Sequence, residues 1–327
     1  MSTDPGLRLL VDLEGLDGTS VALDRSGAHW ALGDERRIQV GDERAVNRTR
    51  TDPPRTLFGM TWSEDGPEVR AGTCAYDQAA DAWVDPPGLE QVLREAAQVG
   101  LADSPDLARV EVAAAAASAD GRELVVATRY LRSRGLQVQD SYYGPSERLV
   151  ALRSSAAGSW TDSPPVVLLA GHAESRALAV GSRFIAAGGD TVRVWERETR
   201  DLVAELPHEY VARDLAFDAD GGRLAVLTAT GALALWDVST AERLASWSAH
   251  DGDGYAVALH PAGELLATGG QDGRLRLWTP EGTLVHEERH EGWVQAVAFS
   301  GDGTRLAAST WARPPHLLVY EVALPGS

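Results

Sequence analysis

The run His286-Glu287-Glu288-Arg289-His290 is the segment with the most obvious chemical potential, because it matches the zinc-binding pattern H-E-x-x-H. On an α-helix this spacing places two histidines one turn apart on a single face, with the glutamate beside them as a general base. On a strand the same histidines would lie roughly 13 Å apart, at about 3.3 Å per residue, and could not share one zinc ion. The chemistry therefore depends on whether the segment is helical or extended.

Internal repeats of about forty residues decide this question. One marker series, spaced by 36, 42 and 40 residues, is His172, His208, His250 and His290. A second, spaced by 41, 42 and 42 residues, is Trp195, Trp236, Trp278 and Tyr320. The two series run in step, so they predict four similar structural units.

Each unit contains short apolar runs that are joined by turns. In the last unit, residues 294–299 and Leu306-Ala307-Ala308 flank Asp302-Gly303, a dipeptide that is typical of tight hairpins. Third and fourth apolar runs follow in the other units, as at residues 273–278 and 284–288. Four antiparallel strands in about forty residues are typical of a propeller blade.

The sequence resembles the WD-repeat family at Gly171-His172, at Trp236-Asp237 and in the run from Ala267 to Gly273. The resemblance implies an all-β, seven-bladed β-propeller of four-stranded antiparallel blades. The three N-terminal units are more degenerate and are placed by turns and apolar runs. The predicted blades span about 16–50, 55–97, 107–170, 171–207, 208–249, 250–289 and 290–323.

The last unit stops after its third strand, near Val322-Ala323, and residues 7–15 read as the missing fourth strand. We expect this N-terminal strand to close the ring, which removes a free sheet edge. Residues 129–147 predict a long hairpin insertion in blade 3. Residues 88–99 fit either a helix or the fourth strand of blade 2, and the register of the other blades favours the strand.

Because the register places His286 on an outer strand and His290 in the next loop, we predict no metal site there. In the WD-repeat family a loop histidine, a hydroxyl, an aspartate and a tryptophan form a buried hydrogen-bond network. By that resemblance, the residues with a structural role are His250, Thr268, Asp272, Trp278, His172, Asp190, Trp195 and Trp236. Cys74, the only cysteine, reads as a small buried hydrophobe on the second strand of blade 2.

Composition excludes several classes of function. A net charge of −18 opposes binding to nucleic acid or to anionic lipid. All 30 basic residues are arginine, so lysine chemistry is absent, and we expect no cofactor. The arginine bias is typical of a high-GC bacterial genome. Residues 1–10 do not resemble a signal peptide and no long apolar run follows, so we expect a cytoplasmic protein.

Binding to a protein or peptide partner is the function that the sequence favours, and its oligomeric state is left open. In WD-repeat propellers the residues that follow the loop histidine face partners, and several here are of hot-spot type. By register these residues are Trp293, Gln295, Tyr255, Asp253, Arg213, Arg176, Phe58 and Asp17. Further candidate surfaces are the insertion, with Tyr142 and Tyr143, and the turn from Trp311 to His316. A hydrolase or lyase at the channel mouth, or a ligand sensor acting with an NTPase or kinase, is the alternative.

Overall fold

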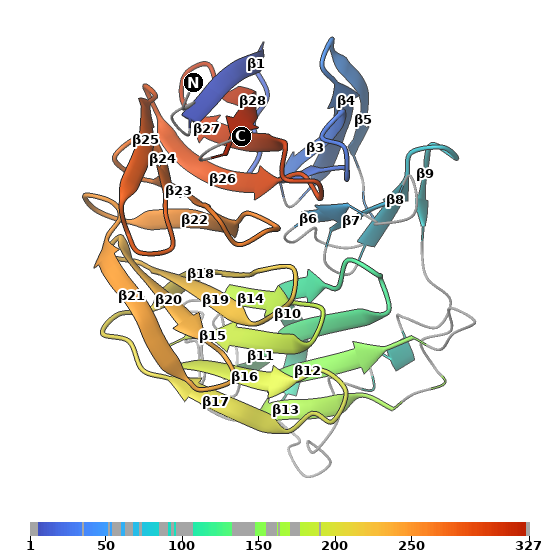
Figure 1. Ribbon diagram of the computed structural model, residues 1–327. Helices are drawn as coiled ribbons and strands as arrows, with labels where there is room; N and C mark the ends of the chain where they lie inside the picture. Colours follow the sequence, from blue (N-terminus) through green and yellow to red (C-terminus); the bar gives the residue numbers. More distant parts are fainter. Residues whose placement is uncertain are drawn as a thin grey trace.

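Seven four-stranded antiparallel sheets form blades around a central channel, which confirms the predicted seven-bladed propeller (Figure 1). This computed structural model describes residues 6–34, 36–51, 53, 60–62, 68–71, 74–84, 91–92, 95, 107–132, 148–154, 162, 164–170, 177–189 and 191–324. Blades 1 to 6 each use four strands that are consecutive in the sequence. The first strand of each blade is the innermost and lines the channel.

Most strands have three to seven residues, as expected for segments that cross a blade once. The strands of blades 1 and 2 are β2 (Ser20–Leu23), β3 (His29–Asp34), β4 (Arg37–Asp42), β5 (Val46–Thr51), β6 (Met60–Trp62), β7 (Glu68–Ala71), β8 (Cys74–Asp77) and β9 (Ala82–Val84). Those of blades 3 and 4 are β10 (Leu107–Ala117), β11 (Glu123–Arg132), β12 (Arg148–Arg153), β13 (Val166–Ala170), β14 (Ala177–Val180), β15 (Phe184–Gly188), β16 (Val192–Glu196) and β17 (Leu202–Leu206). Those of blades 5 and 6 are β18 (Ala212–Phe217), β19 (Arg223–Thr228), β20 (Ala232–Asp237), β21 (Glu242–Ser248), β22 (Gly254–Leu259), β23 (Leu266–Gly270), β24 (Arg274–Trp278) and β25 (Leu284–Arg289). Blade 7 consists of β26 (Trp293–Phe299), β27 (Arg305–Trp311), β28 (His316–Ala323) and β1 (Gly6–Glu14).

One type of turn joins the first two strands in five of the blades. A glycine N–H donates to the carbonyl three residues earlier, and the bonds measure 2.7–3.1 Å. The glycines are Gly27, Gly121, Gly221, Gly263 and Gly303. The repeated turns end the innermost strands on one side of the ring, called here the lower face. The innermost strands begin at the opposite, upper face.

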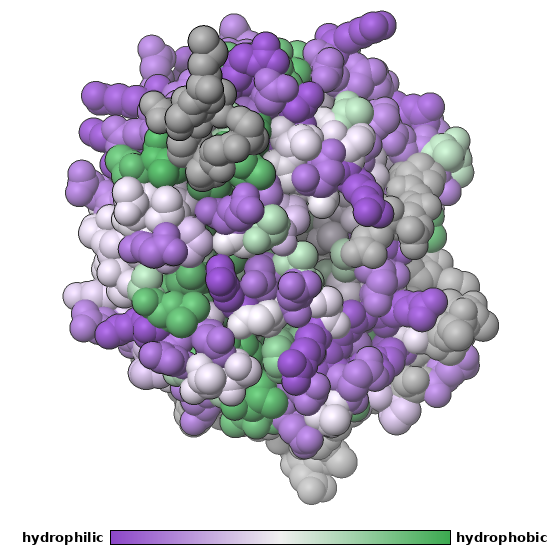
Figure 2. Space-filling model, viewed as in Figure 1, coloured by the Kyte–Doolittle hydropathy of each residue, from purple (hydrophilic) through white to green (hydrophobic). Residues whose placement is uncertain are grey.

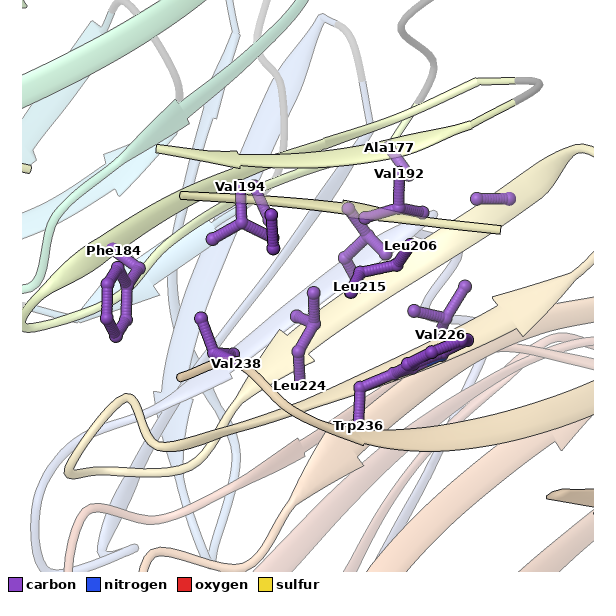
Figure 3. Packing of buried hydrophobic residues seen from close by; sticks show 13 residues of the cluster. Ala177, Phe184, Val192, Val194, Leu206, Leu215, Leu224, Val226, Trp236 and Val238 are labelled. Carbon is purple, nitrogen blue, oxygen red and sulfur yellow. The ribbon is translucent and has the colours of Figure 1, made fainter. Parts of the chain in front are cut away.

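Apolar side chains between adjacent blades form the core. Val194 and Leu206 of blade 4 pack against Leu224 and Trp236 of blade 5, and Figure 3 shows these side chains pointing toward one another. All four are at most 5% exposed. At about 25 cal/mol per Å² of apolar surface removed from water, such contacts provide the main force that holds neighbouring blades together. The outer surface seen in Figure 2 is mostly hydrophilic, in keeping with the charge of −18.

The N-terminal strand closes the ring as predicted. β1 pairs with β28 in antiparallel register from Gly6 opposite Ala323 to Glu14 opposite His316, so the two ends of the chain lie side by side (Figure 1). His316 Nδ1 lies 2.6 Å from a carboxylate oxygen of Asp12 across this pair. Blade 7 therefore combines both ends of the described chain.

Blade 2 differs from the prediction. Its third and fourth strands are β8 and β9, so Cys74 begins the third strand rather than lying on the second. The fourth strand is β9 and not the predicted segment 88–99. Of that segment the structure describes Gln91, Val92 and Glu95, which are helical, and Gln91 donates to Glu95 at 2.9 Å. The apolar residues of this segment follow helical spacing, and Val92, 1% exposed, packs into the core beside blade 3. The helix is therefore favoured over the strand. Within the described residues no helix is long and apolar enough to span a membrane.

Blade 3 consists of β10 to β13, within the predicted span of about 107–170, and its third strand begins at Arg148, just after the predicted insertion. β11 extends to Arg132, but residues 133–147 lie outside the described residues, as do the side chains of Tyr130 and Arg132. The predicted insertion and its aromatic residues therefore stay a prediction. The burial predicted for Cys74 also concerns a side chain outside the described set.

An ionic cluster joins blades 3 and 4 at the lower face. At its centre is Glu123, whose fully buried carboxylate lies 2.5 Å from Arg200, 3.2 Å from Arg153 and 3.6 Å from Arg197. Arg197 also holds Asp120 through two hydrogen bonds of 2.8 and 2.9 Å. Burial raises the pKa of Asp120, but the hydrogen bonds from Ser118, from the Arg122 backbone and from Arg197 outweigh it, so the pKa is lowered overall. The charges in this cluster thus neutralise one another within the fold.

Candidate functional site: the upper face of blades 5 to 7

Local bulges determine which side chains the innermost strands of blades 5, 6 and 7 present at the upper face. Near the start of each strand the pairing register slips by one residue. The residues that the pairing skips are Arg213, Tyr255 and Gln295. A bulge of this kind re-aims the extra side chain, and here it occurs at one repeat position in three successive blades.

Two of these bulged residues, Arg213 and Tyr255, contact the next blade along the ring. The Arg213 guanidinium lies 3.8 Å from the Asp253 carboxylate and 5.6 Å from the centroid of the Tyr255 ring. The Tyr255 ring lies 5.6 Å from Trp293, and Trp293 lies 4.7 Å from Trp311, centroid to centroid. We call Arg213, Tyr255, Trp293 and Trp311 the aromatic rim. It spans three blades, and its last two rings form a cross-strand pair between β26 and β27.

The rim remains open to solvent. Trp311 is 50% exposed, and Tyr255 and Trp293 are half-buried. Burial and the Asp253 carboxylate both raise the pKa of Tyr255, so its phenol is neutral at pH 7. The rim therefore offers neutral aromatic faces beside one guanidinium and one carboxylate.

Loop contacts fix the positions of these rings. The left-handed φ of +73° at Gly273 lets its turn approach the next loop, where the N–H of His290 donates to the Gly273 carbonyl at 2.7 Å. At Gly292 a Cβ atom would lie 2.3 Å from the backbone carbonyl oxygen of Trp311, so only glycine admits this approach. The loop before Trp293 is thereby seated against both neighbouring turns.

A buried polar group holds the corresponding loop of blade 6. His250 Nδ1 lies 2.9 Å from Asp272, which also accepts a hydrogen bond of 2.7 Å from Arg276. Arg276 in turn donates to the Ala249 carbonyl at 2.6 Å. Burial lowers the pKa of His250 despite the opposing effect of Asp272, so the imidazole is neutral at pH 7. This group positions the loop that leads to Asp253 and Tyr255.

In blade 6 the four predicted structural residues form two separate pairs. Trp278 donates to Thr268 at 2.9 Å, apart from the His250–Asp272 pair, and His250 Nε2 has no hydrogen-bond partner among the described residues. Trp195 and Trp236 are buried in the core. His172 and Asp190 lie outside the described residues.

Of the other predicted partner residues, the structure describes Gln295 and Asp17. Gln295 lines the channel, and Asp17 pairs with Arg37 at 3.8 Å in blade 1. Phe58 and Arg176 lie outside the described residues.

The H-E-x-x-H run is extended, as its register indicates. His286 lies on β25, and His290 follows the strand and approaches the Tyr320 hydroxyl at 3.5 Å. In the described part of the chain no three His, Cys, Asp or Glu side chains are grouped as metal ligands would be.

The central channel encloses about 950 Å³. Apolar residues of the innermost strands line most of it, including Leu215, Phe217 and Val257. Asp214, which sequence reasoning did not single out, lies in this wall. The signal was available: the same register position holds Ala256 in blade 6 and Ala296 in blade 7, so a carboxyl departs from the repeat.

Comparison with known families identifies the repeats that carry the rim. The family described as "WD domain, G-beta repeat" matches residues 241–279 and 282–312. These two stretches are therefore similar to WD repeats. Each begins on the outer strand of one blade and continues through the inner strands of the next, and Tyr255, Trp293 and Trp311 all lie within them.

Curated proteins are similar to about a third of the chain. Eukaryotic translation initiation factor 3 subunit I of Pyricularia oryzae is 31% identical over 111 residues, which are 34% of this chain and 33% of that protein. WD repeat-containing protein 3 of Mus musculus is 32% identical over 117 residues, which are 34% of this chain and 12% of that protein. The chain thus spans a third or less of the length of these relatives. They are eukaryotic, so they do not confirm the bacterial origin that the arginine bias suggested.

Proposed function

We propose that this chain is a protein-binding scaffold that holds a segment of its partner against the aromatic rim. The observation that carries the proposal is the continuous contact from Arg213 through Tyr255 and Trp293 to Trp311, across three blades. Tryptophan, tyrosine and arginine dominate the binding energy of protein interfaces. Because the rings are mounted on packed strands and seated loops, little entropy is lost when a partner binds them.

The relatives support the same class of function. One is named as a subunit of a translation initiation factor, so it works within an assembly. The proposal places this scaffold in the cytosol, where a chain with one cysteine needs no disulfide. The channel-mouth enzyme and the ligand sensor stay alternative hypotheses.

Capture of partners from the native cell tests the proposal. Wild-type protein and the variants Trp293→Ala and Leu202→Ser are immobilised at equal density, and bound proteins are quantified by mass spectrometry. Leu202 is the matched control because it is 50% exposed on the outer strand β17, away from the rim. We expect a partner that is retained by wild type and Leu202→Ser and lost from Trp293→Ala. A partner retained equally by all three would contradict the assignment of the rim.

A further inference from the structure

Asp214 lies in the channel wall at the boundary between blades 5 and 6. It directly follows the bulged Arg213, and its two carboxylate oxygens accept the backbone N–H groups of Leu215 and Val257 at 2.9 and 2.8 Å. Val257 belongs to β22, the innermost strand of the next blade. The carboxylate thus caps a strand-edge N–H across the blade boundary, and Asp214 is one of the residues that line the channel.

This carboxyl has no cationic partner among the described residues. Two other carboxylates that line the channel have one: Asp34 lies 3.0 Å from Arg37, and Asp120 lies 2.8 Å from Arg197. Asp218, nearer the lower face, accepts the backbone N–H of Arg223. Arg213 lies against Asp253 and Tyr255 instead. Burial raises the pKa of Asp214 to about 7, and only the two backbone N–H groups act against it.

The lone pairs left on Asp214 define the ligand that it suits. Each oxygen already accepts one N–H, so one acceptor position remains on each, side by side. A planar guanidinium fills two such positions with two parallel N–H donors, whereas an ammonium group is a point charge without that fork. On the neighbouring strand β22, Val257 at the level of Asp214 and Tyr255 nearer the upper face also line the channel, which suits an apolar stem.

The molecule shows related chemistry at the mouth of the same channel. The Arg213 guanidinium lies over the face of Tyr255 with a carboxylate nearby, so Tyr255 already forms one cation–π contact. A second guanidinium passing this ring would reach Asp214, one strand residue, or roughly 3.3 Å, below Arg213.

We propose that the channel is a guanidinium site, in which an arginine-type head group inserted from the upper face pairs with Asp214. The inference rests on the proposed function, since it names the side chain that a rim-bound partner would contribute. The same chemistry could come from a free guanidinium compound, and the experiment separates these two sources. Net charge favours either source, because the chain carries −18.

Isothermal titration calorimetry on the full chain at pH 8.5 tests the site. The probes are agmatine, a Gly-Ser-Arg-Ser-Gly peptide and the same peptide with citrulline, an uncharged replacement for arginine. The variants are Asp214→Ala, which matches Ala256 and Ala296 at the same register, and Asp251→Asn, which removes one exposed charge from the same face. We expect binding to weaken at least tenfold in Asp214→Ala, to stay within twofold in Asp251→Asn, and to vanish for the citrulline peptide.

The dependence on pH adds a second readout. Below a pKa of about 7 the carboxyl is mostly protonated, so arginine binding to wild type should be roughly tenfold weaker at pH 6 than at pH 8.5. Should Asp214→Ala fail to fold, the carboxyl carbon of Asp214 is followed by NMR in the wild type, where the arginine peptide should lower its pKa. If the arginine peptide does not change the pKa of the Asp214 carboxyl, the inference is overturned.

A further variant, Trp293→Ala, shows whether the guanidinium comes from a protein side chain or from a free compound. If Trp293→Ala weakens the arginine peptide but not agmatine, the site serves a protein side chain; equal affinities indicate a small compound, and both results support the guanidinium site. Equal binding of wild type and Asp214→Ala, equal binding of the citrulline peptide, or no binding at all overturns it. A partner that still depends on Trp293 but not on Asp214 leaves the proposed function standing and rejects the inference alone.

Discussion

The aromatic rim and the ionic cluster are built in a similar way but use their side chains differently. Both join adjacent blades through side chains that reach across a blade boundary. In the cluster, the buried Glu123 is surrounded by arginines that neutralise it. In the rim, the rings contact one another at tilted angles along the surface, and Trp311 keeps half of its area in solvent.

This difference teaches which boundary is used for stability and which is available to a partner. A buried charged group that loses its counter-charge is costly, so the cluster should govern unfolding. Exposed rings add little to folding but provide area that a partner can cover. The two regions should therefore respond in opposite ways to substitution.

The largest effect is expected at Glu123. Glu123→Gln leaves three guanidinium groups around a neutral amide, and we expect the free energy of unfolding to fall by about 3 kcal/mol. Urea denaturation at pH 7.5 measures this loss. A change below about 0.5 kcal/mol would show that the cluster does not hold blades 3 and 4 together.

Trp293→Ala should show the reverse behaviour. We expect it to weaken the captured partner by about 2 kcal/mol, roughly thirtyfold, because a central aromatic residue is removed from the interface. Its unfolding free energy should fall by only about 1 kcal/mol, from loss of the Trp311 pair. Calorimetry with the partner and urea denaturation measure the two quantities; a larger loss of stability than of affinity would undo the contrast with Glu123.

Asp214 should give stability an unusual dependence on pH. Its folded pKa, about 7, lies above the unfolded value, so the folded state binds the extra proton. Stability from this group is therefore present below pH 4 and is lost as pH rises toward 7. Because the carboxyl lines an open channel, we expect a total change of only about 1–2 kcal/mol.

Buried histidines change stability in the opposite direction. Burial lowers the pKa values of His250, His260 and His290, so their contribution to folding stability is present above pH 6.5 and is lost as pH falls.

The difference in unfolding free energy between wild type and Asp214→Ala, measured by urea denaturation from pH 4.5 to 7.5, isolates the contribution of the Asp214 carboxyl. An identical slope in both proteins would contradict the raised pKa.

The smallest effect is expected on the closing strand. Arg8 pairs with Glu321 across β1 and β28, but its side chain is 71% exposed. Arg8→Ala should lower the unfolding free energy by less than about 0.5 kcal/mol, because solvent and salt screen the pair. A loss above 1 kcal/mol in the same urea assay would mean that this ion pair, and not strand pairing, closes the ring.

Sequence reasoning located the rim because the histidine and aromatic markers set the register of blades 5 to 7. Asp253, Tyr255 and Trp293 follow directly from that register. The bulges did not, since a one-residue slip leaves no mark in an apolar pattern. Asp214 was hidden among 48 acidic residues until its strand position could be compared with two alanines.

Blade 2 shows where the pattern fails. Its strands β8 and β9 have four and three residues, so they carry too few positions for an alternation to be read. The marker residues of the later blades are absent there, and a strand was expected where Val92 is helical. Short, unmarked strands can be placed only by their pairing partners.

Site-specific photo-cross-linking in the native cell tests the central claim most directly. A benzophenone amino acid at position 311 keeps an aromatic ring in the rim, and the same amino acid at position 202 reports on the outer strand β17. The account predicts a defined covalent adduct with a partner from position 311 and none from position 202. An adduct from position 202 and none from position 311 would show that the partner binds the circumference of the propeller and not the aromatic rim.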